Sequence, residues 1–361
     1  MYDVAIIGLG PAGATLVRLL TSDFKVIAID KKCADVPGGF SKPCGGLLAL
    51  DAQKALSKFN LTLPKEVLVD PQIFAVKTID LKQNLLRHYQ RFYINLDRSK
   101  FDRWLVSLIP SSVELIEGAT CTGIQKTDDG YDVTYNKGGI SRKISARLVV
   151  GADGSDSVVR RSLFPKREVG RYAGIQQWFV EQSSSPFYSC IFDRDVTDSY
   201  CWSVSKDGFF ILGGAFPLKN SREKFELLKT KVKRLGFQFG DPVKTEACFI
   251  SMPRSARDFC TGGRGAFLLG EAAGFISPSS LEGISYALNS ACELADTLNC
   301  GRKDPNRAYT IKTLPIRIKL LLKKLKAPFM YWPLLRRYVM KSGMRTIRVV
   351  DEQKNRTSRR F

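Results

Sequence analysis

Three glycines near the start of the chain have the spacing of a loop that holds a dinucleotide. Gly8, Gly10 and Gly13 stand in "GLGPAG", a G-x-G-x-x-G pattern. In this pattern the first glycine makes the turn, the second admits a pyrophosphate, and the third lets helix and strand pack closely. Asp30 ends the next predicted strand, where a carboxylate accepts a hydrogen bond from a ribose hydroxyl. The sequence therefore predicts a dinucleotide-binding unit whose helix N-terminus faces the phosphates.

The loop "SKPCGGLLAL" (residues 41–50) places a reactive side chain soon after this unit. Pro43 stiffens the chain before Cys44, whereas Gly45 and Gly46 remove side chains and permit positive φ. A bulky planar group can lie against such a backbone, beside the sulfur. The alternative is a turn with an incidental cysteine, and this stretch by itself leaves both interpretations open.

Two later segments favour a flavin dinucleotide over a nicotinamide dinucleotide. Residues 147–161, "RLVVGADGSDSVVRR", are predicted to form a strand, a glycine-rich turn and the start of a helix. Residues 265–288, "GAFLLGEAAGFISPSSLEGISYAL", are predicted to form a strand, a glycine–alanine turn and a loop before a long helix. Nicotinamide-dependent dehydrogenases carry neither segment, so the sequence predicts FAD as the dinucleotide.

These segments resemble the flavoprotein hydroxylase superfamily, which has the glutathione-reductase-type FAD fold. Asp153 and Gly154 match its DG signature. Its late G-D-A-A-G-x-x-x-P motif is matched by Gly270, Ala272, Ala273, Gly274 and Pro278. Glu271 stands where the superfamily has an aspartate that bonds the ribityl chain of the flavin, and a small shift would keep that contact. The resemblance implies an α/β fold: a Rossmann FAD domain with an inserted antiparallel-sheet substrate domain and a C-terminal helical tail.

Three further stretches resemble the geranylgeranyl reductase family, whose members reduce double bonds of isoprenoid chains. They are "PCGG" (43–46), "RSKFDRWL" (98–105) and "YCWSVSKDGFFILGGAFP" (200–217). In that family the Cys-Gly-Gly loop lies at the flavin, and a Y-x-W-x-F-P stretch lines the substrate channel. Tyr200 and Trp202 match the first two positions, whereas Val204 replaces the phenylalanine. Trp178, on another aromatic strand, is a further candidate for the channel, although strand alternation places half of such residues in ordinary core.

The resemblance implies roles for specific residues. The candidate cofactor-binding residues are Gly8, Gly10, Pro11, Ala12, Gly13, Asp30, Lys31, Cys44, Gly45, Gly46, Arg98, Asp153, Gly154, Gly270, Glu271, Gly274, Pro278, Gly283 and Ile284. The candidate substrate-binding residues are Tyr200, Trp202 and Trp178. Cys44 is a candidate catalytic proton donor for a reduced alkene, with ordered water as the alternative. Arg98 contacts the FAD in this interpretation; a surface ion pair is its alternative.

Composition excludes several classes of protein. One histidine, His88, among 361 residues excludes a histidine-based metal site and a Ser-His-Asp triad, and we expect no metal. Nine cysteines without paired metal spacing favour reduced thiols and a cytoplasmic protein. No run reaches the roughly 18 apolar residues of a membrane span. The start, "MYDVAIIGLG", has no basic region before its apolar run, so we expect a strand there and no signal peptide.

The predicted elements suggest three regions. Strands over 3–7 and 25–29 flank a helix that begins in "PAGATLVRLL", and this is a βαβ opening. Further helices are predicted over 97–108, capped by Asp97 or Ser99, over 221–235 and over 281–299. We assign 1–65, 96–165 and 255–300 to a discontinuous FAD-binding domain. Residues 66–95 and 166–254 form the substrate domain, and 301–361 form a basic helical region.

The basic C-terminal region calls for its own explanation. Residues 302–361 hold 18 Lys or Arg against three acids, most of the formal net charge of +21. In "LPIRIKLLLKKLK", the apolar residues Leu314, Ile318, Leu321, Leu322 and Leu325 share one helical face, although Ile316 and Leu320 break the pattern. A basic amphipathic helix with Trp and Tyr nearby suits an anionic membrane surface. A helix packed on the body with its lysines solvated is an equal alternative. We expect no nucleic acid as partner.

The sequence thus predicts an FAD-dependent oxidoreductase that passes hydride to a carbon–carbon double bond of an isoprenoid or other apolar lipid. No second dinucleotide pattern is visible, so NAD(P)H or another donor would bind transiently. A monooxygenase acting on an aromatic or lipid substrate is the first alternative, and a non-enzymatic, membrane-recruited flavoprotein is the second. We expect a cytoplasmic protein, with peripheral association at the inner face of the membrane as an option.

Overall fold

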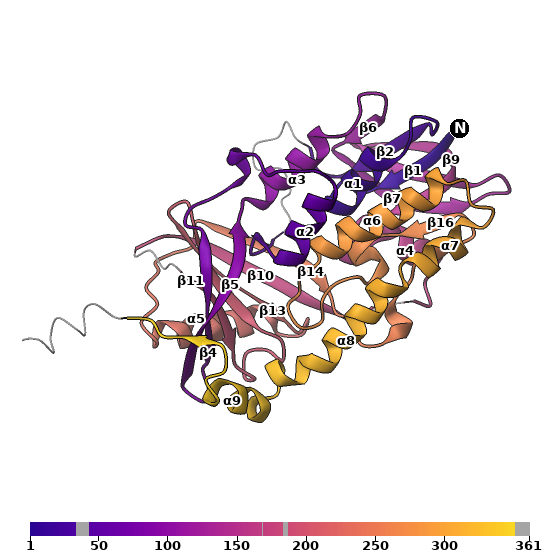
Figure 1. Ribbon diagram of the computed structural model, residues 1–361. Helices are drawn as coiled ribbons and strands as arrows, with labels where there is room; N and C mark the ends of the chain where they lie inside the picture. The colour runs from indigo at the N-terminus through magenta and orange to yellow at the C-terminus, as the bar shows by residue number, and fades with distance from the viewer. Residues whose placement is uncertain (34–42, 168, 183–186, 351–361) are drawn as a thin grey trace, which may run out of the picture.

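The strands of the chain form two separate β-sheets (Figure 1). The computed structural model describes residues 1–33, 43–167, 169–182 and 187–350. The first sheet has the order β15-β16-β9-β1-β2-β6, and β7 and β8 extend it beside β9. Its strands are β1 (Tyr2–Ile7), β2 (Val26–Asp30), β6 (Glu114–Glu117), β7 (Ala119–Lys126), β8 (Tyr131–Lys137), β9 (Ile140–Gly151), β15 (Gly262–Gly263) and β16 (Ala266–Leu268).

The centre of the first sheet is parallel and buried on both faces. Strand β1 pairs in parallel with β2 and β9, and β9 pairs in parallel with β16. Such strands are continuous apolar runs, as in "DVAII" and "KVIAI", because both faces are covered. On one face Ile6 and Val150 pack with helices α1 (Pro11–Leu19) and α6 (Ile284–Asn299). The predicted βαβ opening is confirmed.

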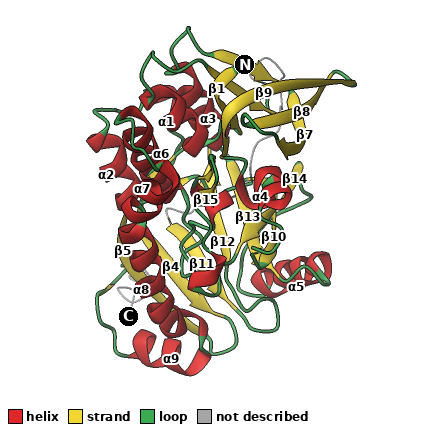
Figure 2. Ribbon diagram, turned by 90° about the vertical axis from the view of Figure 1, so that its right-hand side faces the viewer, coloured by secondary structure: helices red, strands yellow, loops and turns green. Residues whose placement is uncertain are grey.

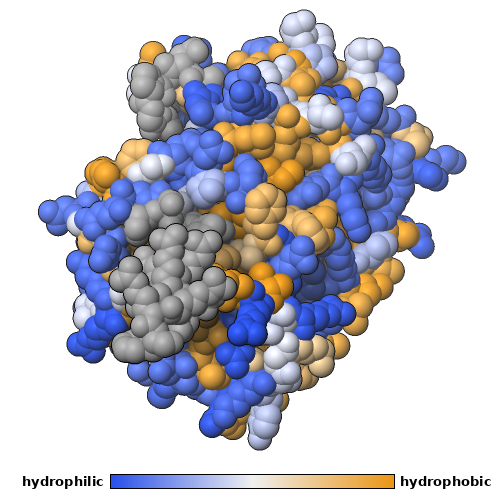
Figure 3. Space-filling view, turned by 60° about the vertical axis from the view of Figure 1, so that its left-hand side comes forward, coloured by the Kyte–Doolittle hydropathy of each residue, from blue (hydrophilic) through white to orange (hydrophobic). Residues whose placement is uncertain are grey.

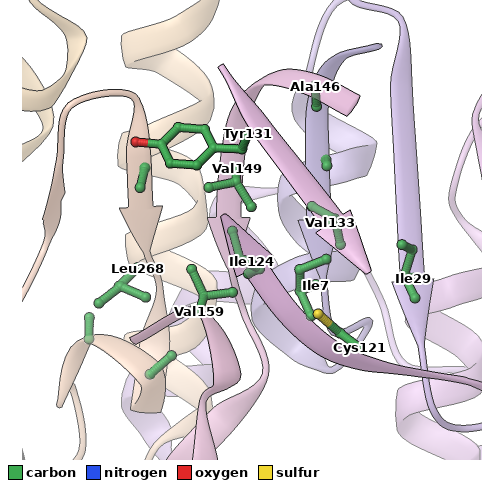
Figure 4. Packing of buried hydrophobic residues seen from close by; sticks show 14 of the residues in the cluster. Ile7, Ile29, Cys121, Ile124, Tyr131, Val133, Ala146, Val149, Val159 and Leu268 are labelled. Atoms are coloured by element: carbon green, nitrogen blue, oxygen red, sulfur yellow. The ribbon is translucent and has the colours of Figure 1, made fainter. Parts of the chain in front are cut away.

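The opposite face of this sheet is covered by β7, β8 and helix α4 (Val158–Leu163). Figure 4 shows Ile7, Ile29 and Val149 pointing into one core with Val133 and Val159. Turns at "DDG" (128–130) and "NKGG" (136–139), residue types typical of hairpins, join β7, β8 and β9 as antiparallel neighbours. This layer therefore closes the side of the sheet away from α1.

The second sheet has the order β14-β10-β13-β12-β11-β4-β5-β17, and β3 pairs with β5. Its strands are β3 (Leu47–Leu48), β4 (Ile73–Asp80), β5 (Leu85–Asn95), β10 (Arg171–Val180), β11 (Phe187–Phe192), β12 (Cys201–Lys206), β13 (Phe209–Phe216), β14 (Lys244–Ser251) and β17 (Thr346–Ile347). The predicted antiparallel pairing is correct with one exception, because β4 and β11 pair in parallel. These two strands are far apart in sequence, so no hairpin fixes their relative direction. Helix α5 (Ser221–Lys233) packs Phe225 and Leu228 on one face of the sheet.

Helix α3 (Arg98–Ser107) leads from β5 of the second sheet to β6 of the first, and it shares a core cluster with helix α2 (Leu50–Lys58), which lies between β3 and β4. Asp97 caps α3 as predicted: its carboxylate accepts from the backbone N–H groups of Ser99 (2.8 Å) and Lys100 (2.9 Å). Apolar surface is not confined to the core. Figure 3 shows one face on which it gathers between hydrophilic residues.

The C-terminal region is helical, as predicted, and returns to the second sheet. Helices α7 (Pro305–Lys312), α8 (Leu314–Tyr331) and α9 (Pro333–Lys341) descend along one side of the molecule (Figure 2). After α9, strand β17 pairs with the edge strand β5, at Tyr89 and His88. No helix among the described residues combines the length and the apolar character that crossing a bilayer requires.

A buried ion pair fastens α9 to the second sheet. The guanidinium of Arg336 donates to the carboxylate of Asp80 at 2.8 and 2.7 Å, and both side chains are buried. Arg336 also donates to the carbonyl of Met330 (2.6 Å) and lies over the ring of Phe192. These contacts surround the charge with partners, which is the condition for a buried ion pair to be tolerated.

We predict that Arg336→Met lowers the free energy of unfolding by about 3 kcal/mol, because the carboxylate of Asp80 stays buried without its cation. Urea unfolding followed by circular dichroism measures the change. Arg337→Met is the matched control, since Arg337 is the exposed next residue. Equal losses in the two variants would contradict the prediction.

Candidate active site

The glycine-rich loop has two filled positions and one open position. A Cβ atom at Gly8 would lie 2.6 Å from the carbonyl oxygen of Ala152, and one at Gly13 would collide with the carbonyl oxygen of Gly8. A Cβ atom at Gly10 would meet no described atom within 4 Å. The first and third glycines are therefore required by packing inside the protein, whereas the second borders open space. This is the arrangement expected of a loop that admits a pyrophosphate at the second glycine.

The start of α1 is free to bind an anion. Pro11 occupies the first helical position and has no N–H, and the first intrahelical bond runs from Ala14 to Gly10 (3.0 Å). The N–H groups before Ala14 have no partner in the helix and lie at its positive end. Asp30 is buried at the end of β2, where its carboxylate accepts from the N–H groups of Leu9 and Lys32. Lys31, which the sequence placed in the site, is exposed.

The DG turn lies directly against this loop. Through the contact between Gly8 and Ala152, residues 152–154 adjoin the first glycine. One carboxylate oxygen of Asp153 accepts from the N–H of Val158 (2.7 Å), at the start of α4. The other oxygen is buried and has no partner among the described residues, and burial raises the pKa of Asp153. Gly154 has positive φ and also borders open space. The turn therefore offers an unsatisfied oxygen beside the candidate nucleotide loop.

The late glycine–alanine turn completes this side of the site. Gly270 lies between Ala12 of α1 and Ala287 of α6, at 3.5 and 3.3 Å from the position of a Cβ atom. Pro278 is buried in the loop that leads to α6. Helix α6 begins at Ile284, with Gly283 as its N-cap, so the predicted start at 281 was wrong. The reason is Leu281, whose φ of 53° cannot belong to a right-handed helix.

Glu271 has a partner that the sequence did not indicate. Its carboxylate accepts from the backbone N–H of Ser251 (2.8 Å), at the end of β14 in the second sheet. The carboxylate therefore links the turn after β16 to a strand of the second sheet. The expected bond to a ribityl chain stays a prediction.

The Cys44 loop is held by a buried lysine that the sequence analysis missed. Lys206, at the end of β12, donates to the carbonyls of Leu96 (2.6 Å) and Gly46 (3.3 Å) and to the amide oxygen of Asn95 (2.8 Å). Burial lowers the pKa of Lys206 to about 8, although the nearby sulfur of Cys44 opposes the shift. A Cβ atom at Gly46 would collide with this ammonium, whereas one at Gly45 would meet no described atom. Among the described residues, the Cβ position is therefore open at Gly45 and filled by the protein at Gly46, and contact of either glycine with a flavin stays a prediction.

Arg98, a predicted cofactor contact, lies inside a charged cluster. Its guanidinium donates to Asp102 at 2.7 Å, and Asp102 also accepts from the ammonium of Lys32 at 2.6 Å. Burial disfavours the charge on Arg98, but Asp102 and the sulfur of Cys44 outweigh it and raise the pKa of the guanidinium. Burial likewise opposes the charge on Asp102, yet its two cationic partners hold the pKa of that carboxyl below its usual value. The cluster brings Arg98 to Cys44.

The three aromatic candidates share one face of the second sheet. Trp202 pairs with Gly213 and Gly213 with Gln176, two residues before Trp178, so these positions point to the same side. That side is opposite α5 and packs against Ile276 and Leu281 in the loop before α6. The hydroxyl of Tyr200 donates to the carbonyl of Ser280 in this loop (2.8 Å).

Two of these aromatic residues differ in how their polar atoms are used. The indole N–H of Trp178 donates to Glu246 (2.8 Å). The indole N–H of Trp202 is buried and has no partner among the described residues. Gln176, which the sequence analysis also missed, has a buried amide oxygen in the same condition. A donor and an acceptor without partners therefore lie in one row of the aromatic face.

We predict that Lys206 makes stability rise with pH. The pKa is about 8 in the folded chain and 10.5 in the reference state, so between these values the unfolded chain binds more protons. The quantity to compare is the unfolding free energy of the native protein minus that of Lys206→Met. This difference should increase by roughly 2 kcal/mol from about pH 7 to about pH 10. Chemical unfolding of both proteins at the two pH values measures it. A parallel pH dependence in both would contradict this account.

The chain is similar to several proteins of known structure. No family model matches the chain. Three of the solved structures with the same fold are as follows. A geranylgeranyl bacteriochlorophyll reductase-like protein from Thermoplasma acidophilum has a TM-score of 0.73 and 16% identity, covering 92% of this chain and 88% of that one. PqsL from Pseudomonas aeruginosa, a probable FAD-dependent monooxygenase, has a TM-score of 0.65 and 19% identity, covering 89% and 93%. The flavin-dependent halogenase CmlS has a TM-score of 0.67 and 17% identity, covering 99% and 70%.

These likenesses show that the chain has the α/β fold of the flavoprotein hydroxylases, as expected. Curated relatives are much closer in sequence. Protein CbrA from Escherichia coli O9:H4 (strain HS) is 51% identical over 343 residues, which cover 95% of this chain and 94% of that protein. Protein CbrA from Shigella sonnei (strain Ss046) is 50% identical, covering 95% and 97%. With half of its residues identical over nearly its whole length, the chain belongs to the CbrA protein family.

Proposed function

We propose that this protein is an FAD-dependent oxidoreductase that reduces carbon–carbon double bonds of an isoprenoid or other apolar lipid. The main support for FAD as the cofactor is the geometry of the glycine-rich loop. Packing fills the Cβ positions of Gly8 and Gly13, whereas the position at Gly10 is open. The buried carboxylate of Asp30 lies at the end of the neighbouring strand. These residues suit the pyrophosphate and ribose of a dinucleotide.

Three segments far apart in sequence support FAD over a nicotinamide dinucleotide. The glycine loop, the DG turn and the glycine–alanine turn adjoin one another through Gly8 with Ala152 and through Gly270 with Ala12. The buried oxygen of Asp153 that lacks a partner is a ready acceptor for a ligand hydroxyl. The described solved structures of this fold include proteins named as FAD-dependent or flavin-dependent.

The aromatic face of the second sheet supports an apolar substrate. Tyr200, Trp202 and Trp178 lie on the side that packs against the loop before α6, and this loop follows the glycine–alanine turn. Such a surface buries hydrocarbon by the hydrophobic effect. A structure with the same fold is named as geranylgeranyl bacteriochlorophyll reductase-like, which favours an isoprenoid.

The reaction requires a hydride for one carbon of the double bond and a proton for the other. FAD, when bound, supplies the hydride after reduction by NAD(P)H or another small electron donor. We assign the proton to the Cys44 thiol, which lies beside Arg98 and Lys206 at the open Gly45. Lys206 holds the carbonyl of Gly46 and so positions the sulfur. Ordered water at the same loop is the alternative donor.

Hydroxylation by a monooxygenase is the second candidate function. The likeness to PqsL and to a flavin-dependent halogenase favours it, because both names denote oxidative chemistry. The same glycine loop and DG turn would hold the cofactor in either reaction. A flavoprotein without catalytic activity is the third candidate.

We predict that Gly10→Val abolishes FAD retention without unfolding the protein. The new side chain would occupy the pyrophosphate approach, yet its Cβ atom meets no described atom. The ratio of flavin to protein absorbance in the purified variant measures retention. Gly240→Val is the matched control, since it is exposed and open in the same sense. A Gly10→Val protein that is purified with bound flavin, and is therefore yellow, would contradict the cofactor assignment.

The two reactions differ in their need for oxygen. We predict that the protein, reduced by dithionite without oxygen and mixed with an unsaturated isoprenoid alcohol, yields a product that has gained one H₂ per saturated bond. Mass spectrometry identifies the product. Turnover only with O₂, and a product that has gained one oxygen atom, would support the monooxygenase. Bound flavin without turnover in either condition would favour the third candidate.

A further inference from the structure

Helix α8 presents an apolar stripe to solvent. Its members are spaced three or four residues apart, which places them on one side of the helix. They are Leu314 (47% exposed), Ile318 (48%), Leu322 (54%), Leu325 (72%) and Phe329 (53%). Soluble proteins scatter exposed apolar residues singly, whereas a contiguous stripe marks an interaction surface.

The opposite side of α8 holds the helix to the body. Leu320 is buried, and Ile316 packs against the same core cluster. These are the two residues that broke the apolar pattern in the sequence. Lys319 and Lys323 form ion pairs with Asp51 of α2 at 2.8 and 3.5 Å. The alternative of a helix packed on the body with its lysines solvated is therefore correct in part. The helix does pack on the body, but its smaller apolar face and two lysines make the contact, and the larger apolar face stays exposed.

Further apolar and aromatic side chains are exposed after the stripe. Trp332 (57% exposed) joins α8 to α9, and Leu334 (68%) and Tyr338 (74%) lie four residues apart on α9. Lys326 and Arg337 are exposed on the same two helices. Trp and Tyr favour the boundary between headgroups and acyl chains, and lysine side chains reach from such a depth to the phosphates.

We propose that the exposed face of α8 and α9 docks on an anionic lipid bilayer. The exposed leucines and Phe329 would enter the headgroup region, and the flanking basic residues would contact the lipid phosphates. Charge complementarity selects this partner, because residues 302–361 carry 18 basic residues and three acids. A second copy of the chain would bring two surfaces of like charge together. Nucleic acid would engage the basic residues but would leave the apolar stripe exposed.

Docking would place the aromatic face of the second sheet near the bilayer. Met330 and Tyr331, at the end of α8, pack into the cluster that contains Tyr200 and Trp202. The hydroxyl of Tyr331 donates to the carbonyl of Ser279 (2.8 Å), in the loop before α6. The helix that carries the stripe therefore also borders the candidate substrate face. The benefit for a lipid substrate rests on the proposed function, whereas docking itself does not.

Sedimentation with phosphatidylcholine vesicles, with and without phosphatidylglycerol, tests the proposal on the full-length protein. We expect affinity at least about tenfold higher for the anionic vesicles, falling as salt is added. Leu322→Glu/Leu325→Glu should lose about tenfold or more in affinity, because two apolar side chains that would enter the bilayer become charges. Leu218→Glu/Val243→Glu is the matched control, since these residues are similarly exposed on the second-sheet part of the molecule (52% and 56%). It should bind like the native protein.

Two further measurements separate the other occupants. Lys326→Glu/Arg337→Glu should weaken binding to anionic vesicles and reduce its salt dependence. Vesicles should shift the fluorescence of Trp332 to the blue, and Trp332→Phe should remove that shift. If the leucine variant bound vesicles like the native protein, the proposal would be overturned, because the apolar stripe would then not contribute to binding. Concentration-dependent dimers that the leucine variant dissolves, without vesicle binding, would overturn it in favour of a second copy. Melting temperatures and flavin content of all variants check that the fold is intact, independently of any reaction.

Discussion

The close approach of helix α1 to strand β1 is the constraint on which the candidate site depends. The helix can lie there only because Gly13 has no side chain next to the carbonyl of Gly8. Gly8 in turn has no side chain next to Ala152, so the DG turn can approach from the other side. With both positions filled by backbone, the space at Gly10 is what remains. Packing inside the protein thus shapes the opening, and the same packing directs the unpaired N–H groups of α1 toward it.

Polar contacts hold the loops around the candidate site. Lys206 extends from β12 to the carbonyls at Gly46 and Leu96, which adjoin β3 and β5 of the same sheet. Glu271 extends from the turn after β16 to the backbone of Ser251 in the second sheet. Burying an ammonium is costly, and the depressed pKa of Lys206 reflects that cost. Three oxygen acceptors offset part of it. Bonds of this kind are directional, so they fix where the Cys44 loop lies relative to the aromatic face better than apolar contact would.

The sequence predicts local features of this fold well and contacts between distant segments poorly. The βαβ opening, the Asp97 cap and the hairpin turns follow from periodicity and turn chemistry, which act over a few residues. Lys206 was missed because it stands beside the turn "KDG", where a lysine ordinarily meets solvent. The partner of Glu271 was missed because the superfamily pattern describes a ligand contact and gives no information on β14. The packing of Lys206 beside Gly46 was missed for a similar reason: a glycine in a loop does not reveal whether a ligand or the protein itself fills the space beside it.

Helix α8 shows why an amphipathic pattern determines a face but not its partner. The periodicity placed Leu314, Ile318, Leu322 and Leu325 together, and the structure keeps them together. In an ordinary surface helix the larger apolar face is buried against the body, because burial of apolar area is the main favourable term. Here the body instead receives Ile316, Leu320 and two lysines that pair with Asp51. The exposed apolar face of α8 contributes no favourable free energy of burial in the isolated chain. It can contribute only when another surface covers the stripe. The arrangement is therefore understandable for a protein that functions against a surface, and costly for one that remains in bulk water.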